Sequence, residues 1–420
     1  FAFYRVNPYF CMEQRTSAFL LRLTAGELLA GFDDLPPGVS DYNFRAAERL
    51  FFDALKDHQN PDGGFRGWRD ARAVSRPYLT AYVLFTMQLA RESNAKRGTD
   101  YKIDRDVYDR AMRYVAGYIA NPPEDGYSYV LESLAFYQYV LARDGKADPG
   151  LERRLFRDRA KMSLRGRGHL LLAMAHRKGV FQADRDGELR TQLDEIKSRM
   201  EVTTQKVSFK EPSSGSYTRA YYSSGSTMGV LLRAFLKLEP AHPLIPGMIQ
   251  YTLADRKHRY WGDSHGSGML AYALLQYRDV FEKEPADFPA LAEIPGLANV
   301  NQNFSGRDQK PITRRIPLFE LMQKGEAGAS YPFRFRRSGG AGGRLYYTAT
   351  LSYSPGLRRD EARDEGIEVR REITNVETGA VAADLERGGM YLVRMTVVNP
   401  KPVFDFMLED PLPSHIESVQ

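Results

Sequence analysis

The sequence contains a single cysteine, Cys11, among 420 residues. An internal disulfide needs two thiols, and cysteine-rich zinc sites and iron–sulfur clusters need several, so this count excludes all three. The seven histidines are spread along the chain, and His169 and His176 lie two turns apart in a helical run. We therefore expect neither a metal site nor a cofactor.

No apolar run approaches the length of a membrane span, so we expect no membrane contact by this segment. The chain starts at Phe1 without a signal-peptide pattern and ends directly after a strand-like run, which favours a piece of a longer protein. The net charge is +6, but the basic residues are scattered. No module for binding nucleic acid is recognisable.

Up to about residue 295 the hydrophobic period is helical. Some runs are apolar on most faces, which is typical of buried helices, and others carry charge on one side. The two kinds alternate roughly every 40 to 60 residues, a period that favours an α/α toroid over an open bundle. Eight helical runs are predicted: 17–32, 46–58, 78–90, 108–120, 128–143, 167–176, 227–238 and 268–281.

After about residue 300 the period changes to two, and β-branched and aromatic residues become frequent. This tail is therefore predicted to be all-β, with more than one module and an incomplete last one. The expected strands lie in "RLYYTATLSYS", "GIEVRREITNV", "MYLVRMTVVN" and "VFDFMLEDPL".

Cys11 lies in "NPYFCMEQRTS" and has three chemical interpretations. It could be a buried structural thiol, because free cysteine packs as a small hydrophobe. It could be a protease nucleophile, which needs a histidine base, but no local signature supports this. In the third interpretation a tight turn brings its sulfur to the carboxamide carbon of Gln14, and loss of ammonia leaves an internal thioester. Tyr9, Phe10 and Met12 would then exclude water from the bond.

This string resembles the thioester segment of the α2-macroglobulin and complement superfamily. The bacterial version is typically Tyr-Pro-Tyr-Gly-Cys-Leu-Glu-Gln. Here Asn7 replaces the first tyrosine and Phe10 the glycine. The matching residues are Pro8, Tyr9, Cys11, Glu13 and Gln14. The resemblance continues in "NPDGGFRGW", "YWGDSHGSGMLAYALLQY" and "GGMYLVRMTVVNPKPVFDFMLEDPLPS".

The resemblance implies a mainly α chain whose first domain, residues 1–297, is a thioester domain with six inner and six outer helices. Residues 298–360 would form the second part of a CUB-like β domain. Residues 361–420 would begin a macroglobulin-like β-sandwich domain. In such a protein the remaining macroglobulin-like domains of the parent chain are partners of this segment.

The resemblance also implies a broad-spectrum protease inhibitor, not an enzyme. Cleavage of a bait region, which this segment lacks, exposes the thioester, and a lysine amine of the target protease then attacks the carbonyl carbon of Gln14. Cys11 is the leaving thiolate, and each molecule reacts once, so no catalytic residue is expected. Bacterial members act in the periplasm, often on a lipid anchor at the inner membrane.

Other residues of the thioester environment are open to two interpretations. Glu13 could orient the thioester or simply suit the first turn of a helix, where an acid interacts well with the helix dipole. Tyr127, Tyr129 and Tyr137 could cover the bond or be core aromatics. Some complement-type members use a distant histidine to favour hydroxyls over amines; the corresponding region, 121–139, has none, so the resemblance implies amine preference.

Two alternatives remain from other classes. "QNPDGGFRGW" is similar to the Gln-Trp motifs of triterpene cyclases, which share the α/α toroid, and Asp33 and Asp34 resemble an acid pair. However, the motif occurs convincingly once, the acids lie in a proline-rich loop, and a cyclase has no use for a β tail. The other alternative is a helical interaction scaffold that has lost its thioester.

Overall fold

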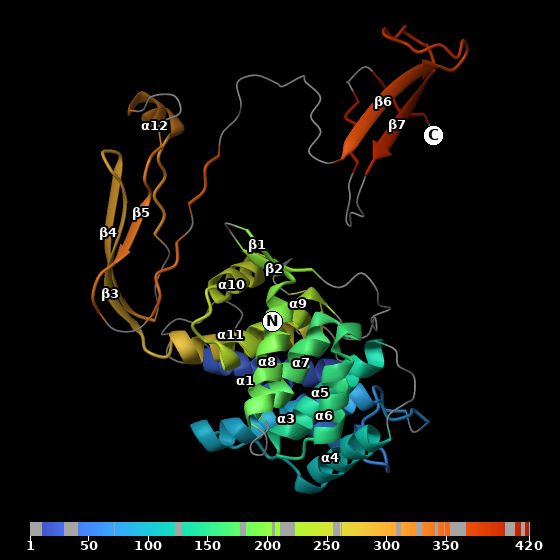
Figure 1. Ribbon diagram of the computed structural model, residues 1–420, viewed down its shortest axis with the longest axis vertical. Helices are drawn as coiled ribbons and strands as arrows, with labels where there is room; N and C mark the ends of the chain where they lie inside the picture. The colour runs from blue at the N-terminus through green and yellow to red at the C-terminus, as the bar shows by residue number, and fades with distance from the viewer. Residues whose placement is uncertain are drawn as a thin grey trace. The chain divides into compact units, whose positions relative to one another are not determined.

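The computed structural model divides the chain into two compact units, Phe1–Tyr347 and Thr348–Gln420. Figure 1 shows helices in the first part of the chain and strands in the later part. The structure describes residues 11–28, 41–70, 72–121, 128–176, 182–203, 206–210, 223–254, 261, 263–307, 312–324, 330–340, 343–347, 349–352, 367–399, 408–412 and 416–419.

Helices dominate the first unit up to Phe281. Their bounds are α1 (Met12–Leu28), α2 (Asp41–His58), α3 (Pro77–Arg97), α4 (Arg105–Ala120), α5 (Ser128–Arg143), α6 (Pro149–Arg157), α7 (Leu164–His176), α8 (Gln182–Lys197), α9 (Ser224–Leu238), α10 (Leu244–Ala254) and α11 (Ser264–Phe281). A short 3₁₀ helix (Arg159–Lys161) precedes α7, and a small hairpin of β1 (Met200–Val202) and β2 (Val207–Phe209) follows α8.

The odd-numbered helices pack on one another in sequence order. Helix α1 contacts α3, which contacts α5, and the series continues through α7 and α9 to α11. Helix α11 packs in turn on α1, so the six contacts form a closed cycle. The even-numbered helices α2, α4, α6, α8 and α10 pack on members of this cycle. All eight predicted helical runs lie in or overlap these helices, whereas α6, α8 and α10 were not predicted.

The two sets of helices differ in how much of their surface is buried. Helix α3 is buried without interruption from Leu79 to Ala90, which explains why its apolar residues show no single face. Helix α4 buries one stripe, in which Val107, Ala111 and Val115 recur every four residues. Its first turn is capped by Asp104, whose carboxylate accepts from the N–H of Asp106 at 3.0 Å.

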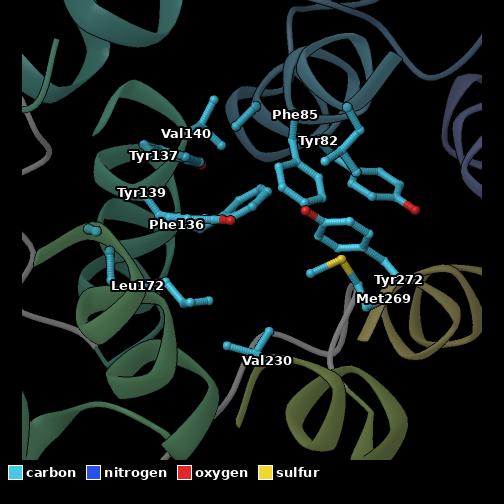
Figure 2. Packing of buried hydrophobic residues seen from close by; sticks show 14 of the residues in the cluster. Tyr82, Phe85, Phe136, Tyr137, Tyr139, Val140, Leu172, Val230, Met269 and Tyr272 are labelled. Atoms are coloured by element: carbon cyan, nitrogen blue, oxygen red, sulfur yellow. The ribbon is translucent and has the colours of Figure 1, made fainter. Parts of the chain in front are cut away.

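Aromatic side chains from different helices meet in the core of the cycle (Figure 2). Phe85 of α3 packs edge-on against Phe136 of α5 at 6.1 Å and against Tyr272 of α11 at 5.8 Å between ring centroids. Edge-to-face pairs at this separation are favourable beyond the area that they bury. These contacts join helices that are far apart in sequence.

The same core contains a buried ion pair between Glu132 of α5 and Arg165 of α7. The Arg165 Nε–H donates to Oε1 of Glu132 at 2.6 Å, and both side chains are at most 2% exposed. The Ser163 hydroxyl donates to the other carboxylate oxygen at 2.7 Å. The carboxylate therefore has partners on both oxygens, as a buried charge requires.

Strand β3 (Ala286–Ile294) begins earlier than the sequence pattern predicted, because helical periodicity was expected up to about residue 295 and α11 ends at Phe281. It pairs antiparallel with β4 (Ala298–Gly306) and with β5 (Arg334–Arg337). Phe288 and Ala290 are buried while Asp287 and Pro289 are exposed, so the period is two. Phe288 lies opposite Phe304 across the ladder.

Not every predicted strand in the tail is present. Among the described residues of 344–352 none lies in a strand, and this segment is held by side chains instead: the Tyr346 hydroxyl is 2.7 Å from that of Tyr277 on α11.

A short helix, α12 (Leu318–Lys324), lies between β4 and β5. In the second unit the two predicted strands are present as β6 (Glu368–Asn375) and β7 (Tyr391–Val398), and they pair antiparallel. Residues 408–412 are not in a strand, and 403–407 lie outside the described residues.

Candidate thioester site

Cys11 and Gln14 meet at the N-terminus of α1. The carbonyl oxygen of Cys11 accepts from the N–H of Arg15 at 3.1 Å, which makes Cys11 the residue that caps the helix. Gln14, three residues later, folds its side chain back, and its Oε1 accepts from the N–H of Cys11 at 3.2 Å. This is one half of a capping box, and it holds the carboxamide of Gln14 beside the residue that carries the thiol.

The Cys11 thiol is half-buried and not in a disulfide. Burial raises the pKa of the thiol above its ordinary value of 9.0, because the thiolate loses solvation. The N–H groups of Gln14 and Glu13, which point out of the helix N-terminus, lower this pKa in part. The charge of Glu13 raises it and that of Arg76 lowers it. The balance keeps the free thiol protonated near neutral pH.

The loop between α2 and α3 supports the first turn of α1. The N–H of Met12 donates to the carbonyl oxygen of Gly67 at 2.8 Å, and the Met12 side chain is fully buried. The loop itself is anchored on α3, since the N–H of Phe65 donates to Oγ1 of Thr80 at 2.8 Å. The carbonyl of Phe65 accepts from Arg76 at 2.8 Å. The position of Cys11 therefore depends on this loop as well as on its own helix.

The loop has a tight turn that only glycine fits. Gly63 has φ 90°, and a Cβ there would lie 2.5 Å from the carbonyl oxygen of Arg110 on α4. Gln59 closes the turn by donating from Nε2 to the carbonyls of Gly63 at 3.0 Å and Val107 at 2.9 Å. This accounts for the "QNPDGGF" string by local geometry.

Glu13 is held by hydroxyl groups from two helices. Ser17, one turn further along α1, donates to its Oε1 at 2.6 Å. Ser264, the first residue of α11, lies 2.8 Å from Oε1 and 3.0 Å from Oε2. Burial raises the pKa of Glu13 above its ordinary value of 4.5, the two hydroxyl donors lower it, and nearby Asp263 raises it. Glu13 thus connects the two helices beside the candidate site.

The other predicted site residues are placed less directly. Tyr137 is buried in α5, and its ring contacts are with Tyr118 at 5.6 Å, Tyr78 and Phe136. None of its described contacts involves residues 11–14, and its role in the thioester environment stays a prediction. Tyr9, Phe10, Tyr127, Asp33 and Asp34 lie outside the described residues. Tyr129 is half-buried on α5.

Sequence reasoning missed Ser17, Gly67 and Ser264. Ser17 is one turn from Glu13, so helical spacing was a usable signal. Gly67 and Ser264 contact the site only through the tertiary fold, and Ser264 is 251 residues away from Glu13. Across the described residues, no group of three His, Cys, Asp or Glu side chains is placed to hold a metal ion. Within the same residues, no helix is long and apolar enough to cross a membrane.

The sequence and the fold of the chain were compared with those of known proteins. Over most of its length the chain is similar in sequence and in fold to bacterial α2-macroglobulins, which confirms the predicted resemblance. A scan against protein-family profiles finds no match. In sequence the chain is 22% identical over 398 residues to an α2-macroglobulin homolog of Nostoc sp., a match that covers 90% of this chain and 20% of that protein. The chain therefore spans about a fifth of that relative's length.

Three of the solved structures that it resembles are α2-macroglobulins in reacted or activated forms. Trypsin-activated α2-macroglobulin of Escherichia coli has a TM-score of 0.54 at 18% identity, covering 93% of this chain and 24% of that one. The same protein activated by porcine elastase has a TM-score of 0.52 at 19% identity, and the match covers 94% of this chain and 32% of that one. Salmonella α2-macroglobulin reacted with methylamine has a TM-score of 0.51 at 17% identity, and the match covers 95% of this chain and 23% of that one. At these identities the likeness shows the fold.

Proposed function

We propose that Cys11 and Gln14 form an internal thioester. The Cys11 sulfur attacks Cδ of Gln14 and the C–S bond forms. The C–N bond breaks, and the leaving amino group takes the thiol proton and departs as ammonia. The product is an acyl donor, because sulfur is a good leaving group. The observation that carries this proposal is the Gln14 side chain folded back on Cys11, with its Oε1 3.2 Å from the Cys11 nitrogen.

The acyl donor would react with amines. A primary amine attacks Cδ of Gln14, a C–N bond forms, and the C–S bond breaks to leave the Cys11 thiolate, which then takes up a proton. The methylamine-reacted form of the Salmonella relative supports this chemistry by analogy. Each molecule reacts once, so the chain is part of a covalent trap and not an enzyme.

In the whole protein the amines would be lysines of proteases that have cleaved a bait region elsewhere in the parent chain. The support is that relatives with this fold have been solved as trypsin-activated and elastase-activated α2-macroglobulins. This is the function of a protease inhibitor. The periplasmic location and the preference for amines over hydroxyls remain predictions from the resemblance.

The domain assignment follows the same proposal. Residues 1–297 would be the thioester domain, and the closed cycle of six helices from α1 to α11 supports an α/α toroid with inner and outer layers. Residues 298–360 would belong to the CUB-like domain and 361–420 to the last macroglobulin-like domain. A cyclase-like enzyme or an inert scaffold would share the helical cycle but would take up no amine at Gln14.

Intact mass spectrometry of the freshly purified chain, before and after methylamine, tests the proposal. A thioester lowers the mass by about 17 Da, and methylamine then adds about 31 Da together with one new titratable thiol. Cys11→Ser, which has no thiol, is the matched control and should show neither change. A mass equal to that of the sequence, a free thiol from the start and no amine uptake, in both the chain and the longer parent protein, would overturn the proposal.

A further inference from the structure

Helices α1 and α11 are the first and last members of the closed helical cycle, and they begin side by side at the candidate site. The first turn of α1 carries Cys11, Glu13 and Gln14, and the first turn of α11 carries Ser264. The Ser264 hydroxyl lies within 3.0 Å of both carboxylate oxygens of Glu13. It is a direct side-chain bridge between the two ends of the cycle.

The carboxylate of Glu13 depends on hydroxyl donors, because no cation of the described part of the chain neutralises it. No lysine, arginine or histidine is among the described groups that act on its pKa. The charge of Asp263 acts on it and is repulsive. Its hydrogen-bond donors among the described residues are Ser17 at 2.6 Å and Ser264. Loss of either donor leaves a buried carboxylate with poorer compensation.

The backbone of the same turn is held from the other side. The N–H of Met12 donates to Gly67 at 2.8 Å, so the turn is tied to the α2–α3 loop through residue 12 and to α11 through residue 13. Cys11 and Gln14 flank these two anchored residues. A thioester across residues 11 and 14 needs a fixed turn, because proximity and orientation control such intramolecular reactions.

We propose that Ser264 is a positioning residue for the thioester: by holding the Glu13 carboxylate it fixes the turn in which Cys11 and Gln14 meet. This inference rests on the proposed thioester. It adds that the thioester depends on the contact between α1 and α11, which closes the helical cycle. Because Ser264 is 251 residues downstream, the turn is complete only after the last helix has docked on the first. The bond would therefore form late in folding and be lost when α11 moves away from α1.

The test compares four versions of the chain: wild type, Ser264→Ala, Ser264→Thr and Ser267→Ala. Ser267 is the matched control, because it lies on the same helix and its hydroxyl contacts the N–H of Trp261 at 3.3 Å instead of Glu13. Two quantities are measured by intact mass: the fraction that carries the 17 Da deficit (about one ammonia) at purification, and its rate of loss in buffer without amine. The rate is followed from about pH 5 to about pH 9.

We expect Ser264→Ala to lose the thioester about tenfold faster than wild type, which is the size of effect typical of a hydrogen bond to a charged group. The inflection of its pH profile should move to higher pH, because one of the two donors that stabilise ionised Glu13 is gone. Ser264→Thr keeps a hydroxyl and should restore the wild-type profile. Ser267→Ala should leave it unchanged. If Ser264 had only a structural role, Ser264→Ala would change the stability of the fold without moving the inflection in the pH profile of thioester loss.

The outcomes separate this inference from the proposed function. A wild-type chain and parent protein without the mass deficit overturn both. Suppose instead that the wild-type chain shows the mass deficit, and that Ser264→Ala loses the thioester at the same rate and with the same pH profile. This result overturns the role of Ser264 alone. If Ser264→Ala does not fold, Glu13→Gln provides the second variant: it should remove the inflection, and a retained inflection would overturn the role of Ser264.

Discussion

The N–H of Cys11 donates to Oε1 of Gln14 at 3.2 Å, and the carbonyl oxygen of Cys11 accepts from the N–H of Arg15 at 3.1 Å. Gln14 therefore satisfies one of the donors that a helix N-terminus leaves unpaired. Its carboxamide is also the group that a thioester would use. The two roles can be separated by substitution, because an acceptor oxygen is enough for the first and an amide that can release ammonia suits the second.

Gln14→Glu should keep the helix cap and remove the chemistry. Its carboxylate can still accept from the Cys11 N–H and suits the helix dipole, so the free energy of unfolding should change by less than about 1 kcal/mol. Gln14→Ala should cost about 0.5–2 kcal/mol, because the donor loses its partner. Denaturant titration measures both, and intact mass should show no deficit in either. A deficit of about 17 Da in Gln14→Ala would contradict the assignment of the acyl carrier.

The Cys11 thiol freed by methylamine should react slowly with iodoacetamide near neutral pH. Burial raises its pKa above 9.0, so the midpoint of the alkylation rate against pH should lie higher in the folded chain than in the chain unfolded in urea. The unfolded chain is the matched control, because it presents the same thiol without burial. Equal midpoints would show that the thiol is not desolvated in solution.

Glu13→Gln should reduce the pH dependence of stability. Since the pKa of Glu13 is raised in the folded state, that state binds more protons than the unfolded chain above the ordinary value of 4.5, and the free energy of unfolding falls as pH rises through the raised pKa. Without the carboxyl group this contribution disappears. Urea titrations at several pH values on either side of 4.5 should show a flatter profile for the variant. An identical slope would mean that Glu13 titrates normally.

Gly63→Ala should be much more damaging than Gly98→Ala. Both glycines have positive φ, 90° and 67°, but a Cβ at Gly63 would lie 2.5 Å from a backbone oxygen whereas nothing lies within 4 Å of one at Gly98. The conformation alone costs roughly 1–2 kcal/mol, which is the expected loss at Gly98. At Gly63 the clash adds to this cost and distorts the loop under Met12. Thermal unfolding of the two variants measures the difference, and equal losses would be unexpected.

Removing one member of the buried pair Glu132–Arg165 should destabilise the chain by about 3–5 kcal/mol, because the other charge remains buried without compensation. Glu132→Gln tests this by denaturant titration. The double substitution Glu132→Leu with Arg165→Met removes both charges and should recover much of the loss. If the double variant were as unstable as the single one, the packing rather than the charge would be responsible.

Much of the helical part was predictable from sequence because its signal is local. Eight of the helical runs were found from apolar spacing. Cys11 and Gln14 were predicted as a reacting pair because they lie within one turn and their string resembles a thioester segment, and this stays a prediction. Helices α6, α8 and α10 were missed; α8 is largely polar and offers little apolar periodicity. Strand β3 was missed because it contains three alanines and a proline, residue types that are depleted in strands, and its pairing with β4 and β5 decides its conformation.

By itself the sequence determined which residues could react, since a thiol and a carboxamide three residues apart lie within one helical turn. Only the tertiary structure decided what holds that turn. Gly67 supports it through Met12, and Ser264 reaches Glu13 from the far end of the helical cycle. Contacts over such separations leave no local pattern, because they depend on how the whole cycle of helices closes.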